Sequence, residues 1–89
     1  MRLKSGLKLR ELGGTYMIVE ASSQVNLTNV YTLNAIAADI WKFIGVSDFT
    51  LSQVATYVCG EYEVDYDSAL RDIESLIDDW QTFGLVIND

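Results

Sequence analysis

The sequence predicts an α+β domain in which an antiparallel sheet of three strands is followed by three helices. The first third of the chain is rich in β-branched and aromatic residues and partly alternates apolar with polar residues, whereas the rest repeats apolar residues at helical spacing. The chain has 89 residues, of which 49% are hydrophobic and 21% charged. This length and composition suit one folded domain, and because no linker or repeat interrupts the chain we expect that domain to span 1–89.

The first two strands are predicted as a hairpin. Leu7–Leu12 alternates apolar and polar residues, and Gly13-Gly14 supplies a two-residue turn before the returning strand Thr15–Glu20. A third extended segment lies within 25–33, and its better half is 29–33. Short links favour a meander in chain order, which leaves the third strand at an edge of the sheet.

The middle of the chain predicts two helices. Asn34 is a suitable N-cap for the first helix, and Gly45 suits its end. The apolar positions of this helix are Ala37, Ile40, Trp41 and Ile44. Thr50 and Gln53 have the spacing of a capping box at the start of the second helix, which ends near Gly60. The core face of the second helix is Leu51, Val54, Ala55 and Val58.

A third and longer helix follows, capped by Asp65 or Asp67 and ending at Gly84. Its predicted apolar stripe is Leu70, Ile73, Ile77 and Trp80, with Leu76 beside it. Both tryptophans of the chain lie on such stripes, so we expect both to be core residues. Residues 85–87 are predicted to add a short final extended piece.

Charge and residue content exclude several classes of function. Six basic against 13 acidic residues give a net charge of −7, which opposes binding to nucleic acid or to an anionic membrane. The chain has no histidine and one cysteine, Cys59, which we expect to be a small buried apolar residue. No internal disulfide, zinc site or Ser-His-Asp triad can form, so we expect a protein without cofactor, metal or catalytic residues. The N-terminus lacks the apolar core of a signal peptide, which favours the cytoplasm.

The pattern of the chain resembles the PqqD family, named after coenzyme PQQ synthesis protein D. The run 33–41 fits the family's spacing Leu-Asn-x-x-Ala-x-x-Ile-Trp in full. The matching residues are Leu33-Asn34, Ala37, Ile40-Trp41, Gly45, Tyr62, Val64-Asp65, Asp72-Ile73 and Gly84-Leu85. The resemblance covers roughly 7–86, and its specificity lies in the order and spacing of these residues.

The resemblance implies a winged-helix-like RiPP recognition element. Such domains are peptide chaperones: they bind the leader segment of a ribosomally made precursor peptide and present it to a modifying enzyme, often a radical SAM enzyme. The leader adds as a strand beside the third strand, in a groove walled by the third helix. Carried onto this sequence, the peptide-binding residues are Asn29, Val30, Tyr31, Thr32, Leu70, Arg71, Ile73, Glu74 and Ile77.

Strand addition also follows from general physical chemistry, because an edge strand has unpaired N–H and C=O groups that a peptide can satisfy. Val30 and Thr32 project to one face and Tyr31 and Leu33 to the other, with Leu33 expected in the core. Tyr31 could stack on a bound peptide. The acidic third helix favours a leader that carries Lys or Arg. Pairing of two copies through their open edges, as a homodimer, stays open.

Two other functions are alternatives to peptide binding. A winged-helix DNA-binding regulator needs a cationic recognition helix, but the third helix carries the acids Asp72, Glu74, Asp78 and Asp79. An acyl or peptidyl carrier protein is suggested by Asp67-Ser68 before a helix, but the expected Leu is replaced by Ala69 and carriers have no β-meander. For Arg71, an ion pair with Asp67 or Glu74 is favoured over contact with a leader carboxylate.

Overall fold

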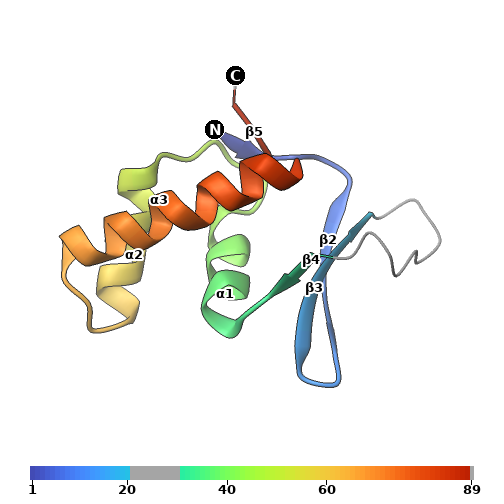
Figure 1. The fold of residues 1–89 in the computed structure, drawn as a ribbon, viewed down its shortest axis with the longest axis horizontal. Helices are drawn as coiled ribbons and strands as arrows, with labels where there is room; N and C mark the ends of the chain where they lie inside the picture. Colours follow the sequence, from blue (N-terminus) through green and yellow to red (C-terminus); the bar gives the residue numbers. More distant parts are fainter. Residues whose placement is uncertain (21–30, 89) are drawn as a thin grey trace. The chain divides into compact units, whose positions relative to one another are not determined.

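The computed structural model describes residues 1–20 and 31–88, which fall into two compact units. The sheet unit is Ser5–Phe43, and the helix unit combines Met1–Lys4 with Ile44–Asp89. Their elements are shown in Figure 1. An antiparallel three-stranded sheet precedes three helices along the chain, which confirms the predicted α+β class.

The sheet unit is built on β2 (Leu7–Leu12), β3 (Thr15–Glu20) and β4 (Tyr31–Leu33), which lie in the order β2-β3-β4 in the sheet. Both neighbouring pairs are antiparallel, so the predicted meander is confirmed. The turn between β2 and β3 holds Gly13 at φ 59° and Gly14 at φ 82°. Positive φ at both central residues is what a two-residue hairpin turn with native twist requires, and glycine adopts it without steric strain.

One face of this sheet belongs to the core. The register pairs Tyr16 with Leu33 and Ile18 with Tyr31, which puts these four side chains on the same face. Ile18 is 2% exposed and Leu33 8%, so this is the inner face, as predicted for Leu33.

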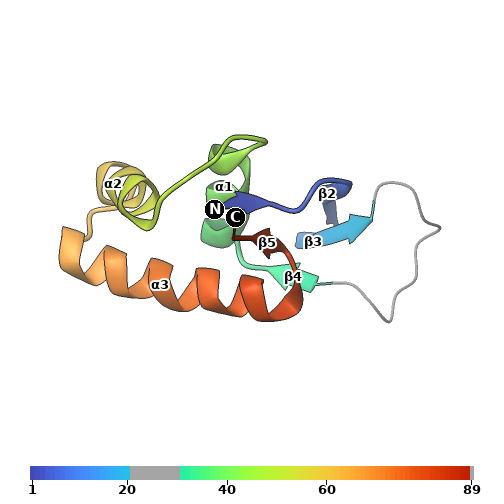
Figure 2. The same ribbon diagram turned by 90° about the horizontal axis from the view of Figure 1, so that it is seen from above.

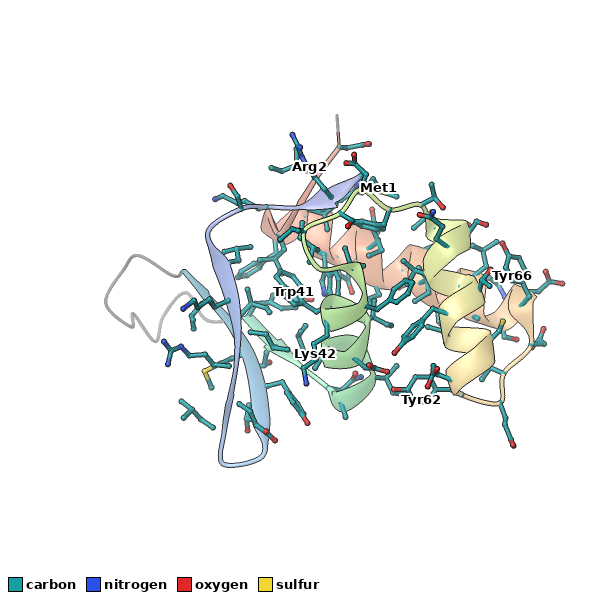
Figure 3. The ribbon with its side chains drawn as sticks, turned by 180° about the vertical axis from the view of Figure 1, so that it is seen from behind. Met1, Arg2, Trp41, Lys42, Tyr62 and Tyr66 are labelled. Carbon is teal, nitrogen blue, oxygen red and sulfur yellow. The ribbon has the colours of Figure 1, made fainter. Side chains whose placement is uncertain are left out.

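Helix α1 (Ala35–Ile44) begins directly after β4. The Asn34 side-chain oxygen accepts a hydrogen bond from the Ala37 N–H at 2.8 Å, which confirms the predicted N-cap. All four predicted apolar positions of this helix are buried, as is Ala38. Lys42 projects from α1 (Figure 3), and its Nζ lies 5.8 Å from the centre of the Tyr16 ring, within range of a cation–π interaction.

In the helix unit, α2 (Leu51–Glu61) packs against α3 (Tyr66–Phe83). The predicted capping box is present: Thr50 Oγ1 accepts from the Gln53 N–H at 3.1 Å, and Gln53 Oε1 accepts from the Thr50 N–H at 2.9 Å. Val54, Ala55 and Val58 of α2 are buried as predicted, whereas Leu51 is half-buried.

The buried stripe of α3 differs by one position from the prediction. It consists of Ala69, Ile73, Ile77 and Trp80. Leu70, expected in this stripe, is half-buried, and Ala69 takes its place. The spacing of four, four and three residues keeps this stripe on one face of the helix.

The two ends of the helix unit are joined by a small antiparallel sheet. The helix α3 ends at Gly84, whose φ is 87°, and the Leu85 N–H then donates to the Trp80 carbonyl at 2.8 Å. β5 (Val86–Ile87) pairs with β1 (Arg2–Leu3), as Figure 2 shows. The final extended piece is therefore confirmed, but the sequence did not predict β1.

Candidate functional site

The outer edge of β4 is the candidate site. In the sheet order β2-β3-β4, β3 has a strand on each side, whereas β4 pairs with β3 alone among the strands that the structure describes. The C-terminal strand β5 pairs with β1, so it does not occupy this edge. Successive residues of a strand direct their N–H and C=O groups to opposite sides, so part of the β4 backbone points away from β3. A third strand at an edge was predicted and is confirmed.

The side chains of β4 alternate between the two faces. Leu33 is buried, Tyr31 half-buried and Thr32 exposed, with Thr32 opposite Met17 on the outer face. A strand added here would therefore meet Tyr31 on its inner side and Thr32 on its outer side. Asn29 and Val30, predicted to extend this edge, lie outside the described residues, and their roles stay predictions.

The five candidate residues on α3 fall into two groups. Arg71 and Glu74 are exposed and Leu70 is half-buried. Ile73 and Ile77 are each 2% exposed, so their side chains belong to the core of the helix unit. Only the first group has side-chain surface that a peptide can contact.

Arg71 makes a different contact from the predicted one. Its Nη2 donates to Ser68 Oγ at 3.5 Å, one helical turn earlier, rather than pairing with Asp67 or Glu74. Hydrogen bonds from the side chain and backbone of Ser68 lower the pKa of Asp65, and the charge of the Arg71 guanidinium lowers it further by a smaller amount. The Arg71 side chain therefore contacts Ser68 near the N-terminal end of α3 and remains exposed.

The exposed surface of α3 is strongly acidic. Its exposed carboxylates are those of Asp67, Asp72, Glu74, Asp78 and Asp79. Asp65 caps the helix, its side chain accepting from the Ser68 N–H at 3.4 Å. Such a surface attracts cations and repels phosphates, so it opposes the recognition-helix role that a DNA-binding regulator requires.

The described residues give no support for a metal site or a membrane-spanning helix. No group of three or more His, Cys, Asp or Glu side chains among them could hold a metal ion. Cys59 is half-buried rather than fully buried as predicted. In the same part of the chain, no helix has the length and apolar character needed to cross a membrane.

The described chain thus has an α+β fold in which three capped helices follow an antiparallel sheet, and β4 is an edge strand among the described strands of that sheet. The sequence model of coenzyme PQQ synthesis protein D (PqqD) matches residues 15–86, and the chain belongs to this family. The predicted family resemblance is therefore confirmed. None of the curated proteins compared with the chain matches it.

Two solved structures share the fold. The first, TbiB1 in complex with the TbiA(beta) leader peptide, has a TM-score of 0.73 and 16% identity, covering 100% of both chains. The second, a lasso peptide synthetase B1 complexed with the leader peptide, has a TM-score of 0.72 and 23% identity, covering 98% of this chain and 96% of the other. At these identities the likeness shows a common fold.

The sheet has a second edge strand, β2, which the sequence analysis did not consider as a site. β2, at the opposite side of the sheet from β4, likewise pairs with β3 alone among the described strands. The signal was present in the sequence, because a three-stranded meander has two edges. The β2 edge was not considered because the family resemblance implies binding at the third strand.

Proposed function

We propose that this chain binds the leader segment of a ribosomally synthesised precursor peptide by strand addition at β4 and presents it to a peptide-modifying enzyme, without catalysing a reaction itself. Membership of the PqqD family supports this function. So does the shared fold with two proteins that were each solved with a leader peptide. A radical SAM enzyme is the partner to test first, because the family resemblance implies it.

The open edge of β4 is the single observation that carries the proposal. A peptide in extended conformation gains backbone hydrogen bonds there, and its alternate side chains distinguish one sequence from another. The peptide backbone bonds supply affinity for any extended chain. Selectivity then depends on the side chains beside Tyr31 and Thr32, one half-buried and one exposed.

The acidic charge of the protein indicates which charge the bound leader peptide should carry. With a net charge of −7 and an acidic α3 surface, the protein favours a leader that carries Lys or Arg. Leu70, Arg71 and Glu74 are the α3 residues proposed to contact it, because Ile73 and Ile77 are core residues.

Proline substitution at adjacent positions of β4 tests the proposal. Because N–H groups alternate in direction, one of Tyr31 and Thr32 donates toward β3 and the other toward the open edge. Tyr31→Pro and Thr32→Pro therefore remove two different hydrogen bonds, one within the sheet and one available to a peptide. We expect the outward variant to keep its melting temperature within a few degrees and to bind the leader at least tenfold more weakly.

Calorimetry with a candidate leader peptide measures the affinity, and circular dichroism identifies the variant that keeps its fold. Val30→Pro provides a second test, because Val30 is predicted from the sequence to extend the peptide-binding edge beside β4. Thr32→Val is the matched control, because it keeps both the N–H and the β propensity. Leader binding that survives in the folded proline variant would place the peptide on another surface.

A further inference from the structure

The outer edge of β2 is longer than the β4 edge and carries a defined charge pattern. All six residues of β2 pair in register with β3, whereas β4 contributes three residues. No hydrogen bond to the other side of β2 is made within the described parts of the chain. Every second residue of β2 thus directs its N–H and C=O toward that open side.

The two faces of β2 differ in chemistry. Leu7 and Leu9 are half-buried on the inner face, while Lys8 and Arg10 are exposed on the outer face. The outer face also holds Leu12, which is 61% exposed. The edge therefore combines two cations, spaced two residues apart, with apolar positions on the opposite face.

Neither cation is neutralised by the neighbouring strand. Lys8 lies opposite Val19, and Arg10 lies opposite Met17. Cross-strand pairs of opposite charge stabilise a sheet, so the missing acidic partners would have to come from the open side.

A second copy of the chain fits this edge poorly. Two β2 strands related by a twofold axis pair antiparallel with residues of the same face opposite each other. In the register centred on Leu9, Lys8 of each copy lies opposite Arg10 of the other copy. The registers centred on Lys8 or on Arg10 place each of these residues opposite itself. Like charges directly opposite destabilise pairing, and charged edges are a common means of preventing self-association.

We infer that the β2 edge binds an extended acidic segment of a partner protein, with Asp or Glu opposite Lys8 and Arg10 and apolar residues beside Leu7 and Leu9. Such a segment supplies the missing cross-strand charges and extends the inner apolar face. The same cations exclude basic segments, which gives selectivity by repulsion as well as attraction. This inference is independent of the proposed leader site, because it rests on the other edge of the sheet.

The two edges would serve two partners at once. Adjacent strands lie about 4.8 Å apart, so strands added at β2 and at β4 would be separated by about 19 Å. Under the proposed function, a modifying enzyme held at β2 and a leader held at β4 are joined through one continuous five-stranded sheet.

A charge-swap titration tests the β2 site. The probe is a blocked heptapeptide of alternating glutamate and valine, added to the ¹⁵N-labelled full chain, and its twin has lysine in place of glutamate. We expect saturable amide shifts centred on 7–12 with the glutamate probe, weakening at 0.5 M NaCl, and none with the lysine twin. The double variant Lys8→Glu, Arg10→Glu should bind the glutamate probe at least tenfold more weakly and should now bind the lysine twin.

Shifts centred on 31–33, shifts absent from 7–12, or equal binding of the glutamate probe by the double variant would each overturn the inference. The exposed substitutions should leave the circular dichroism spectrum unchanged, and Lys8→Arg is the charge-conserving control. Leader binding is measured in parallel. The charge-swapped variant should retain it, whereas the folded β4 proline variant should lose it and still bind the glutamate probe. Failure at one edge is thereby distinguished from failure at the other.

Discussion

The sheet unit and the helix unit differ most in how charge is distributed. The sheet unit is neutral: its charged residues are Lys8, Arg10, Lys42, Glu11, Glu20 and Asp39. The helix unit has three basic and ten acidic residues, so it carries the entire net charge of −7. The open backbone edges belong to the neutral unit.

This difference in charge suggests that the two units contribute differently to peptide binding, one to the affinity and the other to the rate of association. Strand addition depends on backbone groups, which any extended peptide can use. An acidic surface acts over a Debye length, about 8 Å at physiological salt, and mainly raises the association rate of a cationic partner. Under the proposed function, the sheet unit would hold the leader at β4, and the acidic helix unit would raise the association rate of a cationic leader.

The largest expected loss of stability comes from truncating either tryptophan, one of which lies in each unit. Trp80 of the helix unit is 0% exposed and Trp41 of the sheet unit 7%. We expect Trp80→Ala and Trp41→Ala each to lower the free energy of unfolding by about 3–5 kcal/mol, as truncation of a buried aromatic residue does. Urea denaturation followed by circular dichroism measures both. A loss below about 1 kcal/mol would contradict the core role of that tryptophan.

The two tryptophans also test whether the chain unfolds as the single domain predicted for 1–89. Trp80→Phe leaves Trp41 to report on the sheet unit, and Trp41→Phe leaves Trp80 to report on the helix unit. In each single-tryptophan protein, fluorescence and circular dichroism should give the same midpoint. A fluorescence transition that separates from the circular dichroism transition would show that the two units unfold independently.

A smaller effect is expected from the helix caps. Thr50→Ala removes half of the capping box of α2, and Asn34→Ala removes the N-cap of α1. Each should lower the free energy of unfolding by about 1 kcal/mol, because a backbone N–H loses its partner. Thr50→Ser and Asn34→Asp keep an accepting oxygen and serve as controls. If Asn34→Ala leaves stability unchanged, the interaction with the Ala37 N–H contributes nothing measurable.

The caps also explain why the fold was predictable. Asn34, Thr50 with Gln53, and Asp65 each act within three residues along the chain, so the signal and its structural consequence are local. The hairpin turn at Gly13 and Gly14 is local in the same sense. Helices and turns that are determined by residues close together in the sequence were therefore predicted at or near their observed bounds.

Features that depend on distant partners were not predicted. β1 has two residues and no local signal, and it exists because Arg2 pairs with Ile87 and Leu3 with Val86 at the other end of the chain. The buried stripe of α3 includes Ala69 rather than Leu70, and burial at a given helix position is set by tertiary packing rather than by the residue's own hydrophobicity. Ile73 and Ile77 were predicted in the apolar stripe of this helix and are core residues, and the same burial leaves little of either side chain for the peptide contact that the family resemblance implied.

The smallest expected effect concerns the third cap, Asp65, and its dependence on pH. Hydrogen bonds from the side chain and backbone of Ser68 hold the pKa of Asp65 below its ordinary value of 3.8. A carboxyl with a lowered pKa in the folded state stabilises the fold above its unfolded-state value. That stabilisation is lost as the pH falls through the folded-state pKa. Wild type should therefore melt above Asp65→Asn at pH 7, and the two should converge below pH 3.8.

The asparagine variant isolates the charge, because asparagine caps helices about as well as aspartate. Asp65→Ala removes both the charge and the capping oxygen, so it should stay below wild type even after the carboxyl is protonated, since a protonated carboxyl still has an accepting oxygen. Thermal melts of the three proteins between pH 2.5 and pH 7 give the comparison. A constant gap between wild type and Asp65→Asn across this range would show that the charge of Asp65 is not what stabilises the start of α3.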